Sequence, residues 1–195
     1  MRKKRIAIFA SGSGTNAERI ISYFQKHEIF EVTIVLSNKS DAYVLERAKR
    51  LKVNTHVFNR DTFNNSNEIP ELLAELNVDL VVLAGFLWLI PSNLIRSFPD
   101  RIINIHPALL PQYGGKGMYG RHVHEAVIAN GEKESGISIH LVNEVYDEGR
   151  IIFQEKCEVK PGDSPETLAQ RIHELEYQYF PRVIEDFLEQ IDQVE

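Results

Sequence analysis

The chain has 195 residues, 43% hydrophobic and 26% charged, so it is about as long as one domain and can bury a core without disulfide bonds. Its net charge of −6 and its pI of about 5.7 exclude the broad basic surface with which proteins bind nucleic acids or anionic lipids. The single cysteine, Cys157, cannot form an internal disulfide and no run of about 18 apolar residues is present, so we expect a cytoplasmic protein with no membrane partner.

The first predicted unit is a strand, a glycine-rich turn and a helix. Residues 5–10 are almost all apolar, as in a covered parallel strand, and residues 17–26 place Ile20, Ile21 and Phe24 on one helical face. The turn Ser-Gly-Ser-Gly-Thr-Asn at 11–16 aims free N–H groups and the positive end of the helix dipole at one point, which predicts a phosphate site. Because the turn lacks the Lys of a Walker loop and the full GxGxxG spacing, a tight turn without a ligand stays open.

Strands and helices then alternate. We predict strands at residues 32–37, 54–58 and 79–84, helices at residues 43–51 and 68–76, and a polar surface loop at residues 59–67. Strands that alternate with helices at this spacing form βαβ units with right-handed crossovers. The sequence therefore predicts an α/β fold with a doubly wound, mainly parallel, Rossmann-like sheet, in a single domain that spans residues 1–195.

The run Gly-Phe-Leu-Trp-Leu-Ile-Pro at 85–91 is too apolar for an exposed loop. Two explanations stay open, namely packing in the core and lining a pocket for a flat heterocycle. In doubly wound sheets ligands bind beyond the carboxyl ends of the strands, where residues 11–16, residues 85–90 and His106 would converge. This predicts one crevice built from three distant segments.

A short apolar strand at residues 102–106 carries the strongest candidates for catalysis. Pro107 disfavours helical geometry at His106, so Asn104 and His106, two apart, project from the same face of an extended strand. An amide donor beside an imidazole suits a reaction in which an oxyanion forms while a proton moves. The alternative for His106 is a buried histidine satisfied by the backbone.

The histidines do not have the spacing of a metal site. Residues 112–124 contain four glycines in quick succession, which predicts a flexible loop before a helix at residues 123–130. His122 and His124 are two apart, a poor spacing on a helix, and no cysteine joins the candidates. The four candidates are His106, His122, His124 and His140. We therefore expect no bound metal.

The later part of the chain predicts antiparallel strands. Residues 136–143 alternate between apolar and polar types, and the acidic turn that follows leads into a second alternating run at residues 151–159. Asp147 in this turn could reach a catalytic imidazole. The sheet is thus expected to end in antiparallel strands.

A long helix is predicted to close the chain. Ser164 and Pro165 suit its N-cap and first position, Pro181 is expected to kink it, and the chain is expected to fray after Gln190. The apolar stripe expected to pack across the sheet is Leu168, Ile172, Leu175, Tyr179, Val183 and Phe187.

From the first strand to the last helix, the chain resembles the folate-dependent formyltransferases, in particular the branch that acts in de novo purine synthesis. The resemblance is carried by Ser-Gly-Ser-Gly-Thr-Asn at 11–16, Ser-Asn-Lys at 37–39, Val-Leu-Ala-Gly-Phe at 82–86, Asn-Ile-His-Pro at 104–107, Leu-Leu-Pro at 109–111, and Asp147 before Gly149. Asn-x-His-Pro with a downstream Asp marks the whole superfamily, whereas the glycine loop points to a phosphorylated glycinamide substrate.

By position, the resemblance implies roles for individual residues. Asn104, His106 and Asp147 would form the catalytic triad. The implied ribonucleotide site consists of Gly14, Thr15 and Asn16 at the phosphate, with Glu176 as a further ligand. The implied folate pocket consists of Leu87, Leu89, Ile90, Asn143, Val145 and Asp147. Two arginines of the family pattern are absent, since Trp88 stands where many relatives carry Arg and residues 61–67 contain none.

The resemblance implies transfer of a formyl group from 10-formyltetrahydrofolate, a co-substrate, to the amine of 5-phosphoribosylglycinamide. Neither a metal nor a nucleic-acid partner is expected, in a monomer or homodimer. Asn104 would donate a hydrogen bond to the oxyanion, His106 would move a proton, and Asp147 would hold the imidazolium by raising its pKa. The rival functions are a hydrolase that releases formate from the same folate, a relative that formylates a nucleotide-linked sugar or an aminoacyl-tRNA, and a nucleotide-binding module without turnover.

Overall fold

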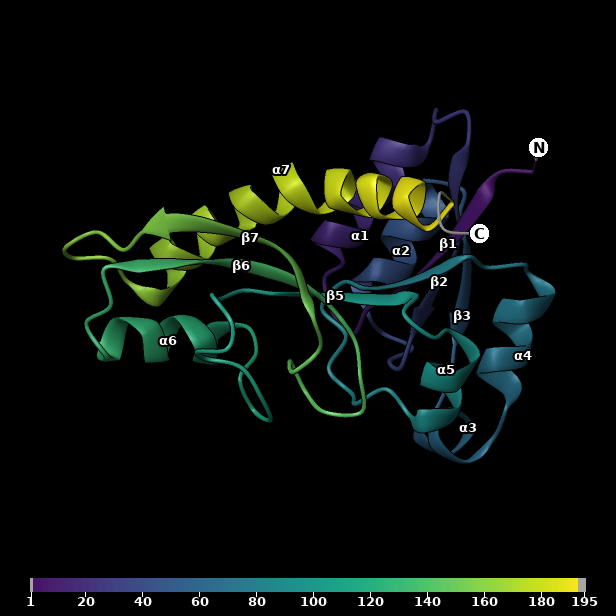
Figure 1. The fold of residues 1–195 in the computed structure, drawn as a ribbon, viewed down its shortest axis with the longest axis horizontal. Helices are drawn as coiled ribbons and strands as arrows, with labels where there is room; N and C mark the ends of the chain where they lie inside the picture. Colours follow the sequence, from purple (N-terminus) through teal and green to yellow (C-terminus); the bar gives the residue numbers. More distant parts are fainter. Residues whose placement is uncertain (1, 193–195) are drawn as a thin grey trace.

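The computed structural model describes residues 2–192, in which seven strands form one sheet (Figure 1). The strands are β1 (Lys4–Phe9), β2 (Phe30–Ser37), β3 (Asn54–Val57), β4 (Leu80–Leu83), β5 (Ile102–His106), β6 (Glu134–Leu141) and β7 (Ile151–Glu158). Their order is β3-β2-β1-β4-β5-β6-β7, with parallel pairing from β3 to β5 and antiparallel pairing of β6 and β7. The predicted fold class is confirmed.

Helices cover both faces of the sheet and bury two hydrophobic clusters. The helices are α1 (Thr15–Phe24), α2 (Tyr43–Arg50), α3 (Arg60–Asn65), α4 (Glu68–Glu75), α5 (Ser92–Ser97), α6 (Arg121–Ala129) and α7 (Pro165–Asp192). Apolar residues of α1, α2, α6 and α7 belong to one cluster, and those of α3, α4 and α5 belong to the other. In Figure 1, α3, α4 and α5 lie together, away from α1 and α7. None of the described helices is both long and apolar enough to cross a bilayer.

The predicted surface loop at residues 59–67 is wrong, because most of it forms α3. The side chain of Asn59 caps this helix, its Oδ1 accepting a hydrogen bond of 2.9 Å from the N–H of Thr62. Phe63 is 1% exposed and stacks on Phe58, with ring centroids 4.9 Å apart. This single apolar residue, buried in an aromatic cluster, stabilises a helix that shows no periodicity in sequence. The short helix α5 was not predicted either.

The other predicted elements are present, with ends displaced by a few residues. The predicted helix at 123–130 begins two residues earlier, at Arg121, and the predicted strand at 136–143 is β6, Glu134–Leu141. In α7 the N–H of Thr167 donates to Oγ of Ser164 at 3.3 Å. The helix continues through Pro181 to Asp192, and the fraying predicted after Gln190 falls partly on residues 193–195, outside the described residues.

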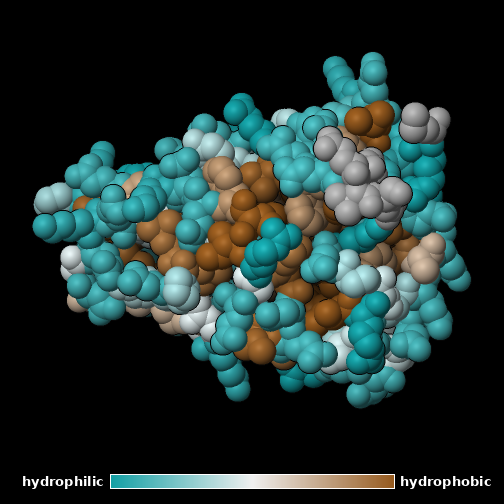
Figure 2. Space-filling view, in the orientation of Figure 1, coloured by the Kyte–Doolittle hydropathy of each residue, from teal (hydrophilic) through white to brown (hydrophobic). Residues whose placement is uncertain are grey.

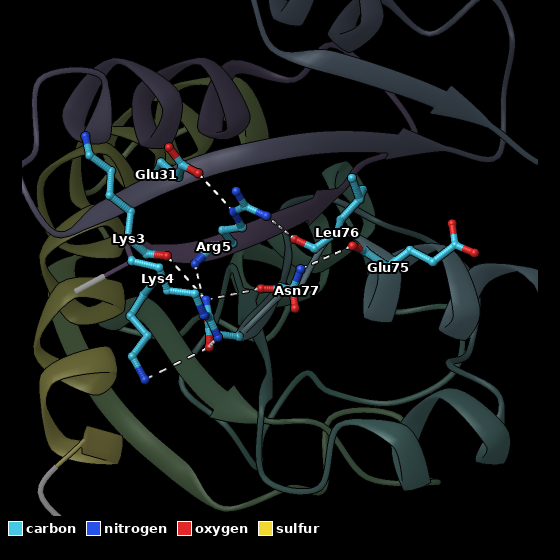
Figure 3. Close-up of polar contacts among 9 residues, drawn as sticks. Lys3, Lys4, Arg5, Glu31, Glu75, Leu76 and Asn77 are labelled. Atoms are coloured by element: carbon cyan, nitrogen blue, oxygen red, sulfur yellow. Dashed lines mark hydrogen bonds and ion pairs between the residues drawn. The ribbon is translucent and has the colours of Figure 1, made fainter.

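Ionic contacts fix the amino end of β1. The guanidinium of Arg5 donates to Glu31 Oε1 at 3.1 Å and to the carbonyl of Leu76 at 2.9 Å (Figure 3). Asp79, just before β4, accepts two hydrogen bonds of 2.7 Å from Arg2 and one of 2.8 Å from the N–H of Arg5. Burial alone would raise the pKa of Asp79, but the hydrogen bonds from Arg2 and Arg5 lower it below its usual value. These contacts hold β1, β2 and β4 together at the end of the sheet opposite the predicted site.

Surface polarity is unevenly distributed. Figure 2 shows hydrophobic residues gathered near the middle of the face drawn in Figure 1, with hydrophilic residues around both ends. The exposed large hydrophobic residues include Leu87, Leu89 and Val145, which the sequence assigned to a folate pocket. Exposed apolar side chains that share one cavity mark a surface suited to an apolar ligand.

Candidate active site

All the predicted site residues line one cavity of about 800 Å³. They come from the turn after β1 and the start of α1, from the loop after β4, from β5, from the turn before β7, and from α7. The volume is typical of a small-molecule site, and the location matches the carboxyl ends of parallel strands. The residues are Gly14, Thr15, Asn16, Leu87, Leu89, Ile90, Asn104, His106, Asn143, Val145, Asp147 and Glu176.

The glycine-rich turn brings the amino end of α1 to this cavity. Gly14, the N-cap, has φ 74° and ψ 27°, a left-handed conformation that favours glycine. A Cβ at Gly14 would lie 2.3 Å from Cγ2 of Val44, so glycine is also needed for the close approach of α2. Because no side chain caps α1, the N–H groups of its first turn remain available to an anion.

Hydrogen bonds join this turn to the loop after β4. The N–H of Ser11 donates to the carbonyl of Gly85 at 3.0 Å, and the N–H of Leu87 donates to Oγ of Ser11 at 3.1 Å. Ser11 is itself buried. The glycine-rich turn and the apolar run at residues 85–91 are therefore hydrogen-bonded to each other along one side of the cavity.

The run at residues 85–91 divides between core and cavity. Phe86 and Ile90 are buried in the hydrophobic cluster of α3, α4 and α5. Leu87 and Leu89 are 41% and 40% exposed and line the cavity, as does the half-exposed Val145 of the turn before β7. An apolar, open wall of this kind suits a flat heterocyclic ring.

An arginine that the sequence analysis did not assign lies at the edge of this wall. The guanidinium of Arg60 packs over the ring of Trp88, 5.1 Å from its centroid. Arg60 directly precedes residues 61–67, the segment in which the resemblance led us to expect an arginine. The contact between Arg60 and Trp88 places a positive charge beside a residue of the cavity lining.

The three predicted catalytic side chains come together at the end of β5. Nδ1 of His106 lies 3.6 Å from Oδ2 of Asp147, and Nδ2 of Asn104 lies 3.5 Å from Oδ1 of the same carboxylate. Asp147 has φ 58°, and its Oδ2 accepts a hydrogen bond of 2.9 Å from the N–H of Gly115. An amide, an imidazole and a carboxylate from different segments therefore form one cluster.

The pKa of His106 lies below its usual value, contrary to the expectation that Asp147 would raise it. Burial lowers the pKa of His106, and this effect exceeds the opposite effects of Asp147 and of the carbonyl of Tyr113. Nε2 lies 2.7 Å from that carbonyl, which assigns the proton of the neutral ring to Nε2 and leaves the lone pair of Nδ1 toward Asp147. The ring is therefore ready to accept a proton at Nδ1, beside a carboxylate that stabilises the resulting cation.

Asp147 is ionised in this arrangement. Burial would raise its pKa, but the hydrogen bond with His140, the nearby His106 and the N–H of Gly115 lower it below the usual value. The cluster thus pairs a neutral imidazole with a negative carboxylate, as a proton-accepting site requires.

Sequence analysis missed the contribution of His140, which it considered only as a metal ligand. In the antiparallel pairing of β5 and β6, His140 lies opposite Asn104 and is 2% exposed. Nδ1 of His140 lies 2.7 Å from the carbonyl of Leu141, and Nε2 lies 3.1 Å from Nδ2 of Asn104 and 3.5 Å from Oδ1 of Asp147. His140 therefore contacts Asn104 and Asp147 at once. The pairing register that creates this contact leaves no signal in the sequence.

A second polar cluster surrounds Glu176, which is 5% exposed. Its Oε2 accepts a hydrogen bond of 2.8 Å from Nδ2 of Asn16 and lies 2.8 Å from Nδ1 of His173. Among residues 2–192, Oδ1 of Asn16 is buried without a hydrogen-bond partner. The two predicted ribonucleotide ligands, Asn16 and Glu176, thus lie in contact with each other.

Metal-ligating clusters are not found among the described residues, where no group of three or more His, Cys, Asp or Glu side chains could hold an ion. His122 lies on the exposed face of α6, away from the other histidines, with its ring 3.7 Å from Glu125.

Comparison with known proteins identifies the class. The profile of the family described as Formyl transferase matches residues 4–184. The chain therefore belongs to the formyl transferase family, which confirms the resemblance and the predicted reaction class.

Comparison with individual relatives shows which formyl transferases the chain is similar to. Phosphoribosylglycinamide formyltransferase of Haemophilus influenzae is 41% identical over 191 residues, which cover 95% of this chain and 88% of the relative. The chloroplastic enzyme of the same name from Arabidopsis thaliana is 40% identical over 189 residues, 94% of this chain, which spans 65% of the length of that relative. The crystal structure of phosphoribosylglycinamide formyltransferase from Streptococcus pneumoniae aligns with a TM-score of 0.83 at 37% identity and covers 96% of this chain and 99% of that chain.

Proposed function

We propose that the chain transfers the formyl group of 10-formyltetrahydrofolate to the amine of 5-phosphoribosylglycinamide, giving the N-formyl product in de novo purine (IMP) biosynthesis. The observation that carries this proposal is a single cavity with three chemically distinct parts. One part is an uncapped helix N-terminus suited to phosphate, one is the cluster of Asn104, His106 and Asp147, and one is an apolar wall. The relatives named above carry the same activity in their names.

Each substrate has a part of the cavity that fits its chemistry. The phosphate is placed at Gly14, Thr15 and Asn16, and Glu176 accepts hydrogen bonds from the ribose hydroxyls. The pterin ring packs on the apolar wall of Leu87, Leu89, Ile90 and Val145, with Asn143 and Asp147 as polar neighbours. Arg60, exposed at the edge of this wall, is placed to attract the carboxylates of the folate tail.

The reaction begins when the amine of the ribonucleotide attacks the formyl carbon. A carbon–nitrogen bond forms, the carbonyl electrons move onto oxygen as an oxyanion, and the attacking nitrogen becomes positive. An N–H of Asn104 donates to the oxyanion in place of its long contact with Oδ1 of Asp147, and such a hydrogen bond is worth about 3 kcal/mol when well placed. His140 holds the amide of Asn104 in the orientation that permits this contact.

His106 then moves the proton. Nδ1 of the neutral ring accepts the proton of the attacking nitrogen, and Asp147, 3.6 Å away, stabilises the imidazolium that forms. The same proton passes to the folate nitrogen as its bond to the formyl carbon breaks and the carbonyl re-forms. The products are the N-formyl ribonucleotide and tetrahydrofolate, and no metal takes part.

We also propose the setting in which this reaction occurs. The site is complete within a single catalytic domain, residues 1–195, that works in the cytoplasm as a monomer or homodimer on small-molecule substrates. It has no nucleic-acid or membrane partner, which agrees with the net charge of −6.

The test mixes the protein with both substrates and follows the folate absorbance. His106→Ala and Asp147→Ala should each lower turnover at least about a hundredfold and leave ribonucleotide binding near normal. His122→Ala is the matched control, because its ring is 61% exposed and does not line the cavity. Formate release without the ribonucleotide would indicate the hydrolase instead, and binding without any absorbance change would indicate a module without turnover.

A further inference from the structure

Tyr113 is not part of the cavity lining, yet its backbone contacts the catalytic cluster. Its carbonyl lies 2.7 Å from Nε2 of His106. Two residues later, the N–H of Gly115 donates to Oδ2 of Asp147 at 2.9 Å. Residues 113–115, which we call the strap, therefore contact the imidazole and the carboxylate of the cluster at the same time.

The strap has a backbone conformation that needs support from outside. Tyr113 has φ 57°, in the left-handed region, which a residue with a large side chain adopts at a cost. The strap also packs closely, since a Cβ at Gly114 would lie 2.6 Å from Cδ2 of Leu110 and 3.2 Å from Cβ of Asp147. Such a conformation persists only where the surrounding contacts over-determine it. The contacts of the Tyr113 side chain therefore bear on the position of its carbonyl.

The phenol of Tyr113 makes its polar contacts at the turn between α6 and β6. Its hydroxyl donates to Oε1 of Glu132 at 2.7 Å and accepts from Nδ2 of Asn130 at 2.9 Å. A hydrogen bond to a carboxylate is stronger than one between neutral groups. The ring packs against the hydrophobic cluster to which α1, α2, α6 and α7 contribute. The side chain of Tyr113 thus ties the strap to the turn after α6.

The segment that leads into the strap is tied to the sheet. The N–H of Leu110 donates to Oγ of Ser138 on β6 at 2.9 Å, and Nε2 of Gln154 on β7 donates to the carbonyl of Leu110 at 3.0 Å. Oγ of Ser138 in turn donates to the carbonyl of Ala108 at 2.7 Å. The chain between β5 and the strap is therefore held at Leu110 by the sheet, and the phenol of Tyr113 supplies a second attachment.

We propose that Tyr113 is a positioning residue, whose phenol, bonded to Glu132, holds the strap against the catalytic pair of His106 and Asp147. The carbonyl of Tyr113 keeps the proton of the neutral imidazole on Nε2 and so directs the lone pair of Nδ1 toward the reacting nitrogen. The N–H of Gly115 keeps the carboxylate beside it. This role rests on the proposed function and adds to it a residue that touches neither substrate.

Several titratable groups face His106 from the elements packed around it. They are Asp147 in the turn before β7, His140 on β6, Glu176 on α7 and His124 on α6. Burial has the largest effect and lowers the pKa of His106, whereas Asp147 and the carbonyl of Tyr113 raise it. Release of the strap removes the contribution of the carbonyl, so the pKa of His106 should fall further. Because the neutral ring accepts the proton, the acid limb of the pH profile should then move to lower pH.

Tyr113→Phe removes the hydroxyl and keeps the ring. We expect its kcat to fall about tenfold, as for the loss of a hydrogen bond to a charged group, with the KM of both substrates near that of the wild type. The acid limb of kcat/KM for the folate should move to lower pH, whereas a loss of folded protein would lower the whole profile without moving it.

Imidazole ¹⁵N NMR of the unliganded protein gives a readout that does not depend on turnover. The signal of His106 is assigned by its absence in His106→Ala. Above the pKa of the ring, the wild type should carry the proton of His106 on Nε2, and Tyr113→Phe should show a mixture of the two neutral tautomers.

Changes at Glu132 test the same contact from its other side. Glu132→Ala should reproduce the effects of Tyr113→Phe, and it carries the test if Tyr113→Phe does not fold. Glu132→Gln keeps an acceptor oxygen and should retain most of the activity. The double variant of Tyr113→Phe and Glu132→Ala should lose no more than either single variant, because both changes break one contact.

Tyr23→Phe is the matched control. The hydroxyl of Tyr23 also donates to a carboxylate, that of Glu185, but neither residue lines the cavity. This variant should keep the kcat, the pH profile and the tautomer of the wild type. Thermal melting checks that each variant is folded.

The outcomes are distinct. A wild-type kcat in Tyr113→Phe would overturn the role of Tyr113, while formyl transfer by the wild type would still uphold the proposed function. A lower kcat with an unmoved pH profile and an unchanged tautomer would also overturn it, because the hydroxyl would then only stabilise the fold. Additive losses in the double variant would overturn the link through Glu132. If the wild type transfers no formyl group, the proposed function and the role of Tyr113 in it both fail.

Discussion

Gly14 is the position at which a single methyl group should test the architecture of the phosphate turn. In Gly14→Ala the new Cβ would lie 2.3 Å from Cγ2 and 2.7 Å from Cα of Val44 on α2. The second contact is with backbone, so rotation of the Val44 side chain cannot relieve it. The residue would also have to keep φ 74°, which alanine adopts at a cost.

Both penalties contribute to the free energy of unfolding. The left-handed conformation costs a non-glycine residue about 1 to 2 kcal/mol. Overpacking against a fixed neighbour costs about 1 to 3 kcal/mol. We therefore expect Gly14→Ala to lower the free energy of unfolding by about 2 to 5 kcal/mol, which in a domain of this size lowers Tm by about 5 to 20 °C. Ribonucleotide affinity should fall as well, because relief of the clash moves the N-terminus of α1.

Chemical denaturation of the unliganded protein measures the first effect, and calorimetric titration with the ribonucleotide measures the second. Gly12→Ala is the matched control, since a Cβ at Gly12 meets no atom within 4 Å, and its stability should equal that of the wild type. Wild-type stability in Gly14→Ala, or an equal loss in both variants, would refute the reasoning that links α1 to α2 through Gly14.

Three further predictions concern charges. Because burial lowers the pKa of His106, kcat/KM for the folate, measured at saturating ribonucleotide, should stay constant as the pH falls to about 6.5 and decline only below it. Asp147→Asn removes a charge that raises this pKa, so it should move the decline to still lower pH. A decline centred above about 6.5 in the wild type would contradict the role of His106 as the proton acceptor. Asp79 has a lowered pKa, so its ionised form stabilises the native state above its unfolded pKa of about 3.9, and this contribution is lost as the pH falls through its native pKa. Asp79→Asn should therefore lower the free energy of unfolding by about 1 to 2 kcal/mol at pH 7, as measured by chemical denaturation. It should also abolish the loss of stability that protonation of Asp79 causes at low pH. Equal stability of variant and wild type at pH 7 would show that the contact with Arg2 contributes nothing. Arg60→Gln should raise the KM of the folate by up to about fivefold with kcat unchanged, and an unaltered KM would remove Arg60 from the folate site.

Local patterns in the sequence were sufficient for most of the fold. The apolar run that became β1, the stripe of Ile20, Ile21 and Phe24 on α1, and the Ser164-Pro165 start of α7 each depend on neighbours a few residues away. The same holds for Asn104 and His106, which strand periodicity places on one face. Alternating strands and helices admit few arrangements, so the parallel pairing of the first five strands followed from the pattern, whereas their order did not.

Contacts between residues far apart in the chain decided the features that local patterns did not predict. Helix α3 forms because Phe63 enters an aromatic cluster with Phe58, which no local periodicity reveals. Arg60 contacts Trp88, a residue of the cavity lining, because the fold carries it over the indole ring.

The protonation state of the site was likewise fixed by the tertiary structure. The sequence placed a carboxylate near His106 and so predicted a raised pKa, but desolvation depends on everything packed around the ring, and it reverses the sign. His140 meets Asn104 only through the register of two antiparallel strands. Thus the sequence by itself determined that the glycine-rich turn, Asn104 and His106 stand at strand ends, because turns and strand periodicity are short-range patterns. The tertiary structure alone decided their partners and the pKa shifts, because pairing and burial depend on residues far apart in the chain.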